Sequence, residues 1–211
     1  MNNRGFVLID ADNTLWDTNA VFAEAQLKLF EAVRAESQAS EISDPLSFVR
    51  SIDQAIAERH HDGLRYPPRL LARALGEAFR GIHVATAARR SLGSGVGRQQ
   101  DFEREVEAVF LSDLRRVPEL RRGVREGLGE LRYRSIPVVI LSESSREKVM
   151  ATAQALGIDG LIEKTFEGKK RKRLFARFAR LAGPGNEPFV IGDQLDRDIA
   201  PASAAEATRT Q

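Results

Sequence analysis

Three short, continuous apolar runs constrain the fold of this chain more than any other feature of its sequence. They are Phe6–Ile9, Val138–Leu141 and Phe189–Ile191. A short uninterrupted apolar run is typical of a strand that is buried on both faces, as in parallel sheets. Between the second and third runs, apolar residues recur at helical spacing: Val149, Met150, Ala153, Leu156, Leu174, Phe175, Phe178 and Leu181. Strands that alternate with helices predict an α/β fold with a parallel sheet.

The segment between the first two apolar runs has a different pattern, because its apolar residues recur at helical rather than strand spacing. One helix is predicted from Val21 onward, and two more around residues 46 to 59 and 67 to 79. With 211 residues, of which 42% are hydrophobic, the chain is long enough to bury a core and to carry an insert. We therefore expect a core formed by residues 1–16 and 115–211, with a helical insert at 17–114.

The composition excludes several classes of function. Thirty-two basic residues nearly balance thirty acidic ones, so the net charge of +2 predicts neither a nucleic-acid partner nor a membrane partner. Cysteine is absent, which excludes disulfides, thiolate metal sites and cysteine nucleophiles, and agrees with a reducing cytosol. The N-terminal apolar run is too short for a secretory signal, and no run reaches transmembrane length. A soluble, cytoplasmic protein is expected.

Polar residues follow each of the three apolar runs. Asp10 and Asp12 come after the first, Ser142 after the second, and Gly192 with Asp193 after the third. Right-handed crossovers bring the carboxyl ends of parallel strands to one edge of a sheet, so these residues are expected to converge. Crowded carboxylates raise one another's pKa unless a cation neutralises them, and oxygen ligands without histidine or cysteine suit Mg²⁺. The pattern predicts a magnesium site.

Four short segments together resemble, in order and spacing, the motifs of the haloacid dehalogenase-like (HAD) hydrolases. They are "DADNT" at residues 10–14, Ser142 at the end of "VVILS", Lys169 in "EGKKRKRLF", and "GDQLDRD" at residues 192–198. The first and last segments are the more specific ones. This resemblance implies a Rossmann-like parallel sheet core with an all-α cap inserted after the first strand.

The resemblance covers residues 5–17 and 117–208, whereas the insert matches the family's C1 cap only by its position and helicity. Family members usually continue beyond the last helix with an Ala-Gly step and a further strand. Glu206 stands here in place of that glycine. The C-terminal edge strand is therefore expected to be missing, which would leave a sheet edge open to pairing with another chain.

The family's catalytic and metal-binding roles fall on five aspartates of this chain. By resemblance, Asp10 is the nucleophile that forms an aspartyl-phosphate, and Asp12 is the acid and base. Asp193, Asp10 and the backbone carbonyl of Asp12 would hold Mg²⁺, with Asp198 supporting it directly or through water and Asp196 as a substitute. Alternate residues of an extended chain share a face, so the one-residue spacing lets the first two carboxylates reach one pocket.

Three further residues would bind the phosphoryl oxygens. By resemblance, Thr14 and Ser142 offer hydroxyl groups and Lys169 a positive charge as negative charge builds on those oxygens. Lys169 aligns best with the family motif, and Lys170 is the alternative lysine. Ser142 fits equally well as a cap of the following helix, and the basic run fits a solvated helix face.

The resemblance implies a Mg²⁺-dependent phosphoric monoester hydrolase that acts on a small phosphorylated metabolite through an aspartyl-phosphate. A carboxylate at Asp12 separates phosphatase-type members from dehalogenases, whose motif lacks it. A sugar phosphate, a nucleotide and phosphoglycolate are substrates of this class. Two alternatives are phosphoryl transfer of the phosphosugar-mutase type, and a catalytically inactive HAD-like protein that binds a ligand or partner. In the insert, Arg65, Arg69 and Arg73 fit either a second anionic group of the ligand or a solvated helix face. The oligomeric state is left open.

Overall fold

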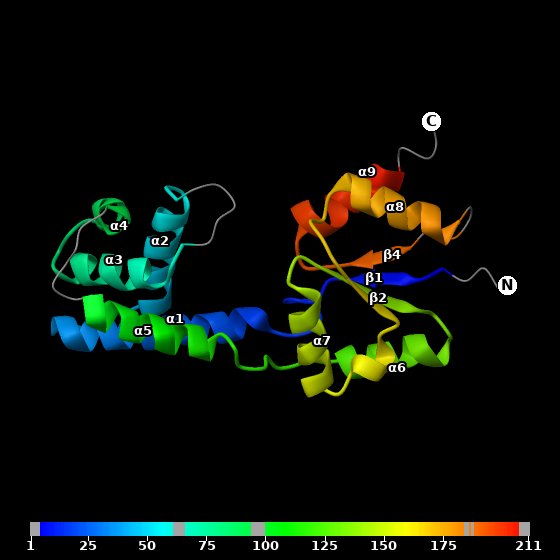
Figure 1. Ribbon diagram of the computed structural model, residues 1–211, viewed down its shortest axis with the longest axis horizontal. Helices are drawn as coiled ribbons and strands as arrows, with labels where there is room; N and C mark the ends of the chain where they lie inside the picture. Colours follow the sequence, from blue (N-terminus) through cyan, green and yellow to red (C-terminus); the bar gives the residue numbers. More distant parts are fainter. Residues whose placement is uncertain (1–4, 61–65, 94–99, 184–185, 187, 207–211) are drawn as a thin grey trace. The chain divides into compact units, whose positions relative to one another are not determined.

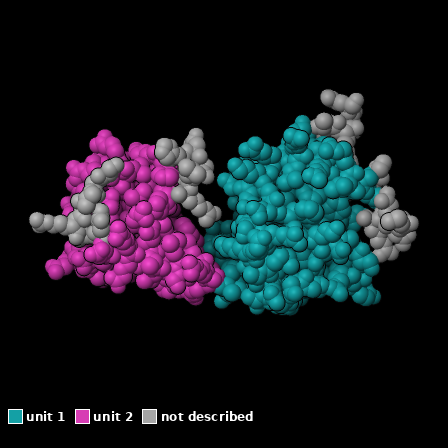
Figure 2. Space-filling view, viewed as in Figure 1, with its two compact units in different colours: residues 1–19, 117–211 teal, residues 20–116 magenta. Residues whose placement is uncertain are grey.

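The computed structural model describes residues 5–60, 66–93, 100–183, 186 and 188–206. The chain divides into two compact units, coloured separately in Figure 2: residues 1–19 with 117–211 form unit 1, and residues 20–116 form unit 2. The chain therefore leaves unit 1 once, after its first strand, and returns to it once. Within the described ranges, no helix combines the length and the apolar character that crossing a membrane requires.

Unit 1 is built on a parallel four-stranded sheet. Its strands are β1 (Val7–Ile9), β2 (Val138–Ser142), β3 (Lys164–Glu167) and β4 (Phe189–Ile191), in the spatial order β3-β2-β1-β4. All three strand pairs are parallel, and Leu8 of β1 lies opposite Val139 of β2 and Val190 of β4. The prediction of a parallel α/β fold is thus confirmed.

Helices cover both faces of this sheet (Figure 1). They are α6 (Val124–Tyr133), α7 (Arg146–Ala155), α8 (Lys172–Ala182) and α9 (Ala200–Glu206). Side chains of a strand alternate between faces. One face of β1 and β2 therefore packs with α6 and α7 through Val7, Ile9, Val138, Ile140, Leu128, Val149 and Ala153. The other face packs with α8 and α9 through Leu8, Val139, Leu141, Phe175, Phe178, Ala202 and Ala205. Burial on both faces explains why these strands read as continuous apolar runs.

Strand β4 is the edge of the described sheet. After it, the described chain forms a short π-helix, η2 (Leu195–Ile199), and then α9, with no fifth strand up to residue 206. The side chains of Phe189 and Ile191 are accordingly exposed, whereas Val190 packs on the face that α8 covers. This arrangement agrees with the expectation from the sequence that a C-terminal edge strand is missing.

Unit 2 is helical throughout its described part. Its helices are α1 (Thr18–Ser37, whose first two residues still belong to unit 1), α2 (Pro45–Ala57), α3 (Arg69–Phe79), α4 (Val84–Leu92) and α5 (Gln100–Asp113). Asp44 accepts a hydrogen bond from the Ser47 N–H at 3.0 Å and Pro45 occupies the first turn, so α2 starts where both features favour a helix N-terminus. The shared core includes Leu29, Phe30, Val49, Ile52, Ile56, Leu71, Leu75 and Phe110.

Within unit 1, the loop that follows β1 is pinned to the segment by which the chain returns. The Asp17 N–H donates to the Glu119 carbonyl at 2.9 Å, and the Arg121 N–H donates to the Leu15 carbonyl at 3.0 Å. Trp16 lies between these two bonds and is almost fully buried. The loop that carries Asp12 is therefore held in a fixed position.

Candidate active site

The candidate site lies at the carboxyl ends of β1, β2 and β4, together with the segment that follows β3. Asp10 is the first residue after β1, and its N–H donates to the Ile191 carbonyl of β4 at 2.9 Å. This bond fixes the Asp10 side chain where the two strands end. The side chain is almost fully buried.

One lysine of the basic run enters this site. The Lys170 ammonium donates to Asp10 Oδ1 and, at 2.6 Å, to Asp198 Oδ1, and the residue is buried. The side chain of Lys169 is exposed. The assignment of Lys169 is therefore corrected to its alternative, Lys170. The Arg171 N–H donates to the Lys169 carbonyl at 2.9 Å, so the backbone turns tightly at Lys170, and the Lys170 N–H donates to Glu143 Oε1 at 3.1 Å.

Three carboxylates converge at the same place. Carboxylate oxygens of Asp10, Asp193 and Asp198 all lie within 4.8 Å of one another. Asp196 is exposed, and among the described residues it does not belong to this group. A set of hard oxygen donors of this kind fits Mg²⁺, which prefers carboxylates and water over nitrogen or sulfur ligands.

The position of Asp198 depends on η2 and on a glycine. The Asp198 N–H donates to the Gln194 carbonyl at 2.8 Å, and Asp198 Oδ2 accepts from the Gln194 N–H at 3.1 Å. A Cβ atom built on Gly192 would lie only 2.2 Å from Asp198 Cγ. Glycine at this position therefore allows the Asp198 carboxylate to pack directly against the backbone.

The Asp12 carboxylate has hydrogen-bond donors of its own. Its Oδ1 accepts from Trp16 Nε1 at 3.1 Å and from Thr18 Oγ1 at 2.6 Å, and its Oδ2 accepts from Ser144 Oγ at 2.7 Å. Partial burial on its own would raise the pKa of Asp12, but these hydrogen bonds to the charged form lower it below its usual value. The Asp12 carboxylate is thus oriented and ionised.

The two predicted hydroxyl residues also lie at the site. Ser142 is fully buried at the end of β2, and its Oγ accepts from the Ser144 N–H at 3.0 Å. The residue that caps α7 is Ser145, whose Oγ accepts from the Lys148 N–H at 3.3 Å, so the Ser142 hydroxyl is not the cap of this helix. Thr14 Oγ1 lies 3.5 Å from Asp10 Oδ2, at the limit of a hydrogen bond.

Asp10 and Lys170 have opposite charges in a buried setting. Burial raises the pKa of Asp10 to about 6, an effect that the Lys170 hydrogen bond and charge reduce and the neighbouring Asp198 reinforces. Burial alone would lower the pKa of Lys170, but its bonds to Asp10 and Asp198 raise it. At neutral pH the lysine is therefore a cation, and Asp10 is mostly an ionised carboxylate that is poorly solvated. A poorly solvated carboxylate close to a cation is suited to nucleophilic attack.

Three partners of Asp12 were not identified from the sequence as functional residues: Trp16, Thr18 and Ser144. In the serine-rich segment at residues 142–145, Ser142 was assigned to the phosphoryl oxygens by resemblance, but Ser144 indicated only helix capping. A signal was present in Asn13, because asparagine tolerates the left-handed conformation better than most residues, and its φ is 62°. That turn folds the chain back and allows Trp16 and Thr18 to reach Asp12.

The sequence left two roles open for the arginines of the insert: binding a second anionic group of the ligand, or lying on a solvated helix face. Arg73 forms an ion pair with the buried Glu103 at 2.6 Å, and Arg69 pairs with Glu107 at 3.0 Å, both within unit 2. Arg65 lies outside the described residues. Two of these three side chains are thus engaged within their own unit.

The chain is similar to known proteins in sequence and in fold. The sequence model of the haloacid dehalogenase-like hydrolase family matches residues 6–206. A search of curated protein sequences finds no match.

Several solved structures share the fold. A HAD family hydrolase from Deinococcus radiodurans R1, with bound phosphate and sodium, is 20% identical with a TM-score of 0.60, and the match covers 97% of this chain and 79% of that one. YfnB from Bacillus subtilis, bound to magnesium, is 17% identical with a TM-score of 0.59, covering 96% and 86%. A chain from Thermotoga maritima assigned as a β-phosphoglucomutase is 15% identical with a TM-score of 0.59, covering 96% and 82%. At these identities the likeness concerns the fold alone.

Proposed function

Because the chain belongs to the haloacid dehalogenase-like hydrolase family, we propose that it is a Mg²⁺-dependent phosphoric monoester hydrolase. Its substrate is a small phosphorylated metabolite, and the reaction passes through an aspartyl-phosphate on Asp10. One observation carries the proposal: a buried carboxylate, Asp10, meets a lysine and two further carboxylates, while Asp12 is held separately beside them. The absence of cysteine supports a cytoplasmic location.

In the first step an oxygen of the Asp10 carboxylate forms a bond to phosphorus. The ester P–O bond breaks, and its electron pair goes to the leaving oxygen. Asp12 donates a proton to that oxygen, so that an alcohol leaves rather than an alkoxide. It must take up this proton in the substrate complex, because in the free protein its hydrogen bonds lower its pKa and favour the carboxylate. Covalent capture on Asp10 splits one difficult displacement into two easier ones.

In the second step Asp12, now a carboxylate, takes a proton from a water molecule. The water oxygen forms a bond to phosphorus, the bond from phosphorus to Asp10 breaks, and inorganic phosphate leaves. The same carboxyl group therefore acts as acid and then as base, which requires that it lie beside the reaction centre without being bound by the Lys170 ammonium. Among the described residues, the side chains that hydrogen-bond to Asp12 are Trp16, Thr18 and Ser144, whereas the Lys170 ammonium donates to Asp10 and Asp198.

The phosphoryl oxygens need donors as charge builds on them. Lys170 supplies a positive charge next to Asp10, and the hydroxyl group of Ser142, which accepts the Ser144 N–H, still has its own hydrogen to donate. Thr14, next to Asp10, offers a second hydroxyl. These three residues are the proposed donors to the phosphoryl oxygens.

The carboxylates of Asp10, Asp193 and Asp198, with the backbone carbonyl of Asp12, would hold Mg²⁺. When bound, the ion neutralises the charge of the phosphoryl group and of the crowded carboxylates. YfnB is bound to magnesium and the Deinococcus radiodurans hydrolase to phosphate, and both observations support the proposal that this chain binds Mg²⁺ and a phosphoryl group. Unit 2 is proposed to act as the cap that selects the substrate.

The proposal is tested by a phosphatase assay on 4-nitrophenyl phosphate and a panel of phosphorylated metabolites, with and without Mg²⁺. We expect release of free phosphate that chelation abolishes, and no activity in Asp10→Asn. Asp193→Asn should require a higher Mg²⁺ concentration. Asp196→Asn, which removes an exposed carboxylate of the same loop, is the matched control and should retain activity.

Equal rates in the wild type and Asp10→Asn would refute the mechanism. Transfer of phosphate to a second position of a sugar phosphate, without free phosphate, would instead favour the mutase type, to which the Thermotoga maritima chain is assigned. A protein inert toward the whole panel would favour a ligand-binding role.

A further inference from the structure

Ser144 makes a contact that the proposed reaction has not yet used. Its hydroxyl donates to Asp12 Oδ2 at 2.7 Å, and the two residues are 132 positions apart in the sequence. Ser144 lies in the loop between β2 and α7, and Asp12 lies in the loop after β1. This hydrogen bond therefore ties together the loops that follow two neighbouring strands.

The other bonds to the Asp12 carboxylate are local. Trp16 and Thr18 lie four and six positions beyond Asp12 in its own loop, and both donate to Oδ1. They set the carboxylate relative to that loop only. Ser144 differs from them because it lies in the loop after β2 and donates to the other carboxylate oxygen, Oδ2. Among the described side chains that donate to Asp12, it is the one outside the loop of Asp12 itself.

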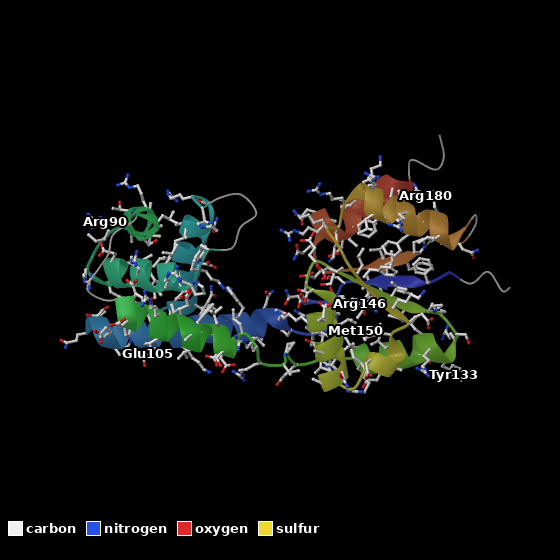
Figure 3. The ribbon with its side chains drawn as sticks, viewed as in Figure 1. Arg90, Glu105, Tyr133, Arg146, Met150 and Arg180 are labelled. Carbon is white, nitrogen blue, oxygen red and sulfur yellow. The ribbon has the colours of Figure 1, made fainter. Side chains whose placement is uncertain are left out.

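Ser144 is itself held by the strand that precedes it. Its N–H donates to the Oγ of Ser142, which is fully buried at the end of β2. On the other side, Ser145 caps α7, which starts at Arg146, labelled in Figure 3. The Ser144 hydroxyl is thus carried by a short loop fixed at both ends.

We propose that Ser144 is a positioning residue that sets the place of Asp12 relative to the phosphoryl-binding end of β2. The inference rests on the proposed function. Ser142 contacts the phosphoryl group in that reaction, and Ser144 joins Ser142 to Asp12 through two successive hydrogen bonds. Without the Ser144 hydroxyl, Asp12 keeps its local bonds but loses its alignment with the leaving oxygen.

This role makes a prediction that depends on the leaving group. Protonation by Asp12 matters more when the leaving oxygen is more basic, because a weakly basic leaving group departs without a proton. Phenyl phosphate and 4-nitrophenyl phosphate have nearly the same shape, but the phenolate is the more basic leaving group. Loss of alignment should therefore slow the first ester more than the second, whereas general damage to the site should slow both equally.

The experiment measures kcat/KM for both esters, at saturating Mg²⁺, in the wild type and four variants. For Ser144→Ala we expect a loss of about 10- to 100-fold on phenyl phosphate and of less than about threefold on 4-nitrophenyl phosphate. Ser144→Thr keeps the hydroxyl and should restore the wild-type ratio. Ser145→Ala removes the neighbouring serine and the α7 cap, and should leave the ratio unchanged. Thermal unfolding of each variant checks that it is folded, and Ser144→Cys, a weaker donor of similar shape, should show the same dependence to a smaller extent.

Two results would overturn the inference alone: equal losses on the two esters in Ser144→Ala, or wild-type values for both. A wild-type protein that hydrolyses neither these esters nor any member of the metabolite panel would overturn the proposed function and this inference with it. The two failures are therefore distinguishable in one set of measurements.

Discussion

A methyl group at Gly192 is expected to damage the site by displacing Asp198. The Cβ atom of Gly192→Ala would lie 2.2 Å from Asp198 Cγ, 2.3 Å from Oδ2 and 2.5 Å from Cβ. Non-bonded carbon atoms separate to about 3.5–4 Å, so the overlap exceeds about 1 Å. Asp198 cannot move aside freely, because Lys170 at 2.6 Å and the Gln194 N–H at 3.1 Å both hold its carboxylate.

The expected loss follows from these contacts. Overpacking of a buried site costs about 1–3 kcal/mol, and a hydrogen bond to a charged group contributes about 1.5–3 kcal/mol. The two costs do not simply add, because part of the strain is relieved when a hydrogen bond to the Asp198 carboxylate breaks. We therefore expect Gly192→Ala to lower the free energy of unfolding by about 2–4 kcal/mol. Phosphatase activity should fall by at least about 100-fold, because a carboxylate of the proposed metal site is displaced by about 1 Å.

The matched control is Gly127→Ala in α6. A Cβ atom at Gly127 meets nothing within 4 Å, and the residue lies inside the helix. Alanine in a helix interior is more stable than glycine by about 0.5–1 kcal/mol, so the same chemical change should raise stability here. Urea unfolding followed by circular dichroism, with phosphatase rates on the same samples, measures both effects. A Gly192→Ala protein as stable and as active as the wild type would refute the argument.

Two further predictions concern Lys170 in the candidate site and Tyr66 in unit 2. Lys170→Met leaves two buried carboxylates without their cation, so it should abolish activity. In urea unfolding without divalent cations, it should lower the free energy of unfolding by about 3–5 kcal/mol. The control Lys169→Met, at an exposed position, should change that free energy by less than about 0.5 kcal/mol, and equal effects of the two variants would contradict the assignment of Lys170. In unit 2, Tyr66 donates to Asp53, and burial, followed by this bond, raises the pKa of the phenol above its usual 10.0. Because the folded state binds that proton more tightly, the stability that Tyr66 contributes is complete below pH 10 and is lost as the pH rises toward the folded pKa. The difference in unfolding free energy between wild type and Tyr66→Phe, about 1–2 kcal/mol at neutral pH, should therefore shrink above pH 10, and a constant difference would exclude this account.

The sheet and the convergence of the acidic residues could be predicted because they depend on simple periodicity. Strands β1 and β2 are buried on both faces, so their residues are apolar without interruption. The order of strands and helices then brings Asp10, Asp193 and Asp198 to one edge, whatever the details of the loops. These features follow from patterns that many neighbouring residues share.

The loops could not be predicted to the same depth, because single dihedral angles decide them. Lys169 and Lys170 are chemically identical in the sequence, and they differ in the structure through the bonds of Lys170, whose N–H donates to Glu143 and whose ammonium donates to Asp10 and Asp198. The partners of Asp12 depend on the left-handed turn at Asn13 and on a hydrogen bond from Ser144 across 132 positions. A contact of that kind has no periodic signal in the sequence.

The most direct test of the mechanism is to trap phosphate on Asp10. Asp12→Asn should still accept phosphate from 4-nitrophenyl phosphate, whose leaving group needs no proton, but should release it slowly because the base of the second step is missing. We expect acid quenching after rapid mixing to give a stoichiometric burst of 4-nitrophenolate, with labelled phosphate bound to the peptide that contains Asp10. Steady hydrolysis without protein-bound phosphate, or a label on any other residue, would contradict the account.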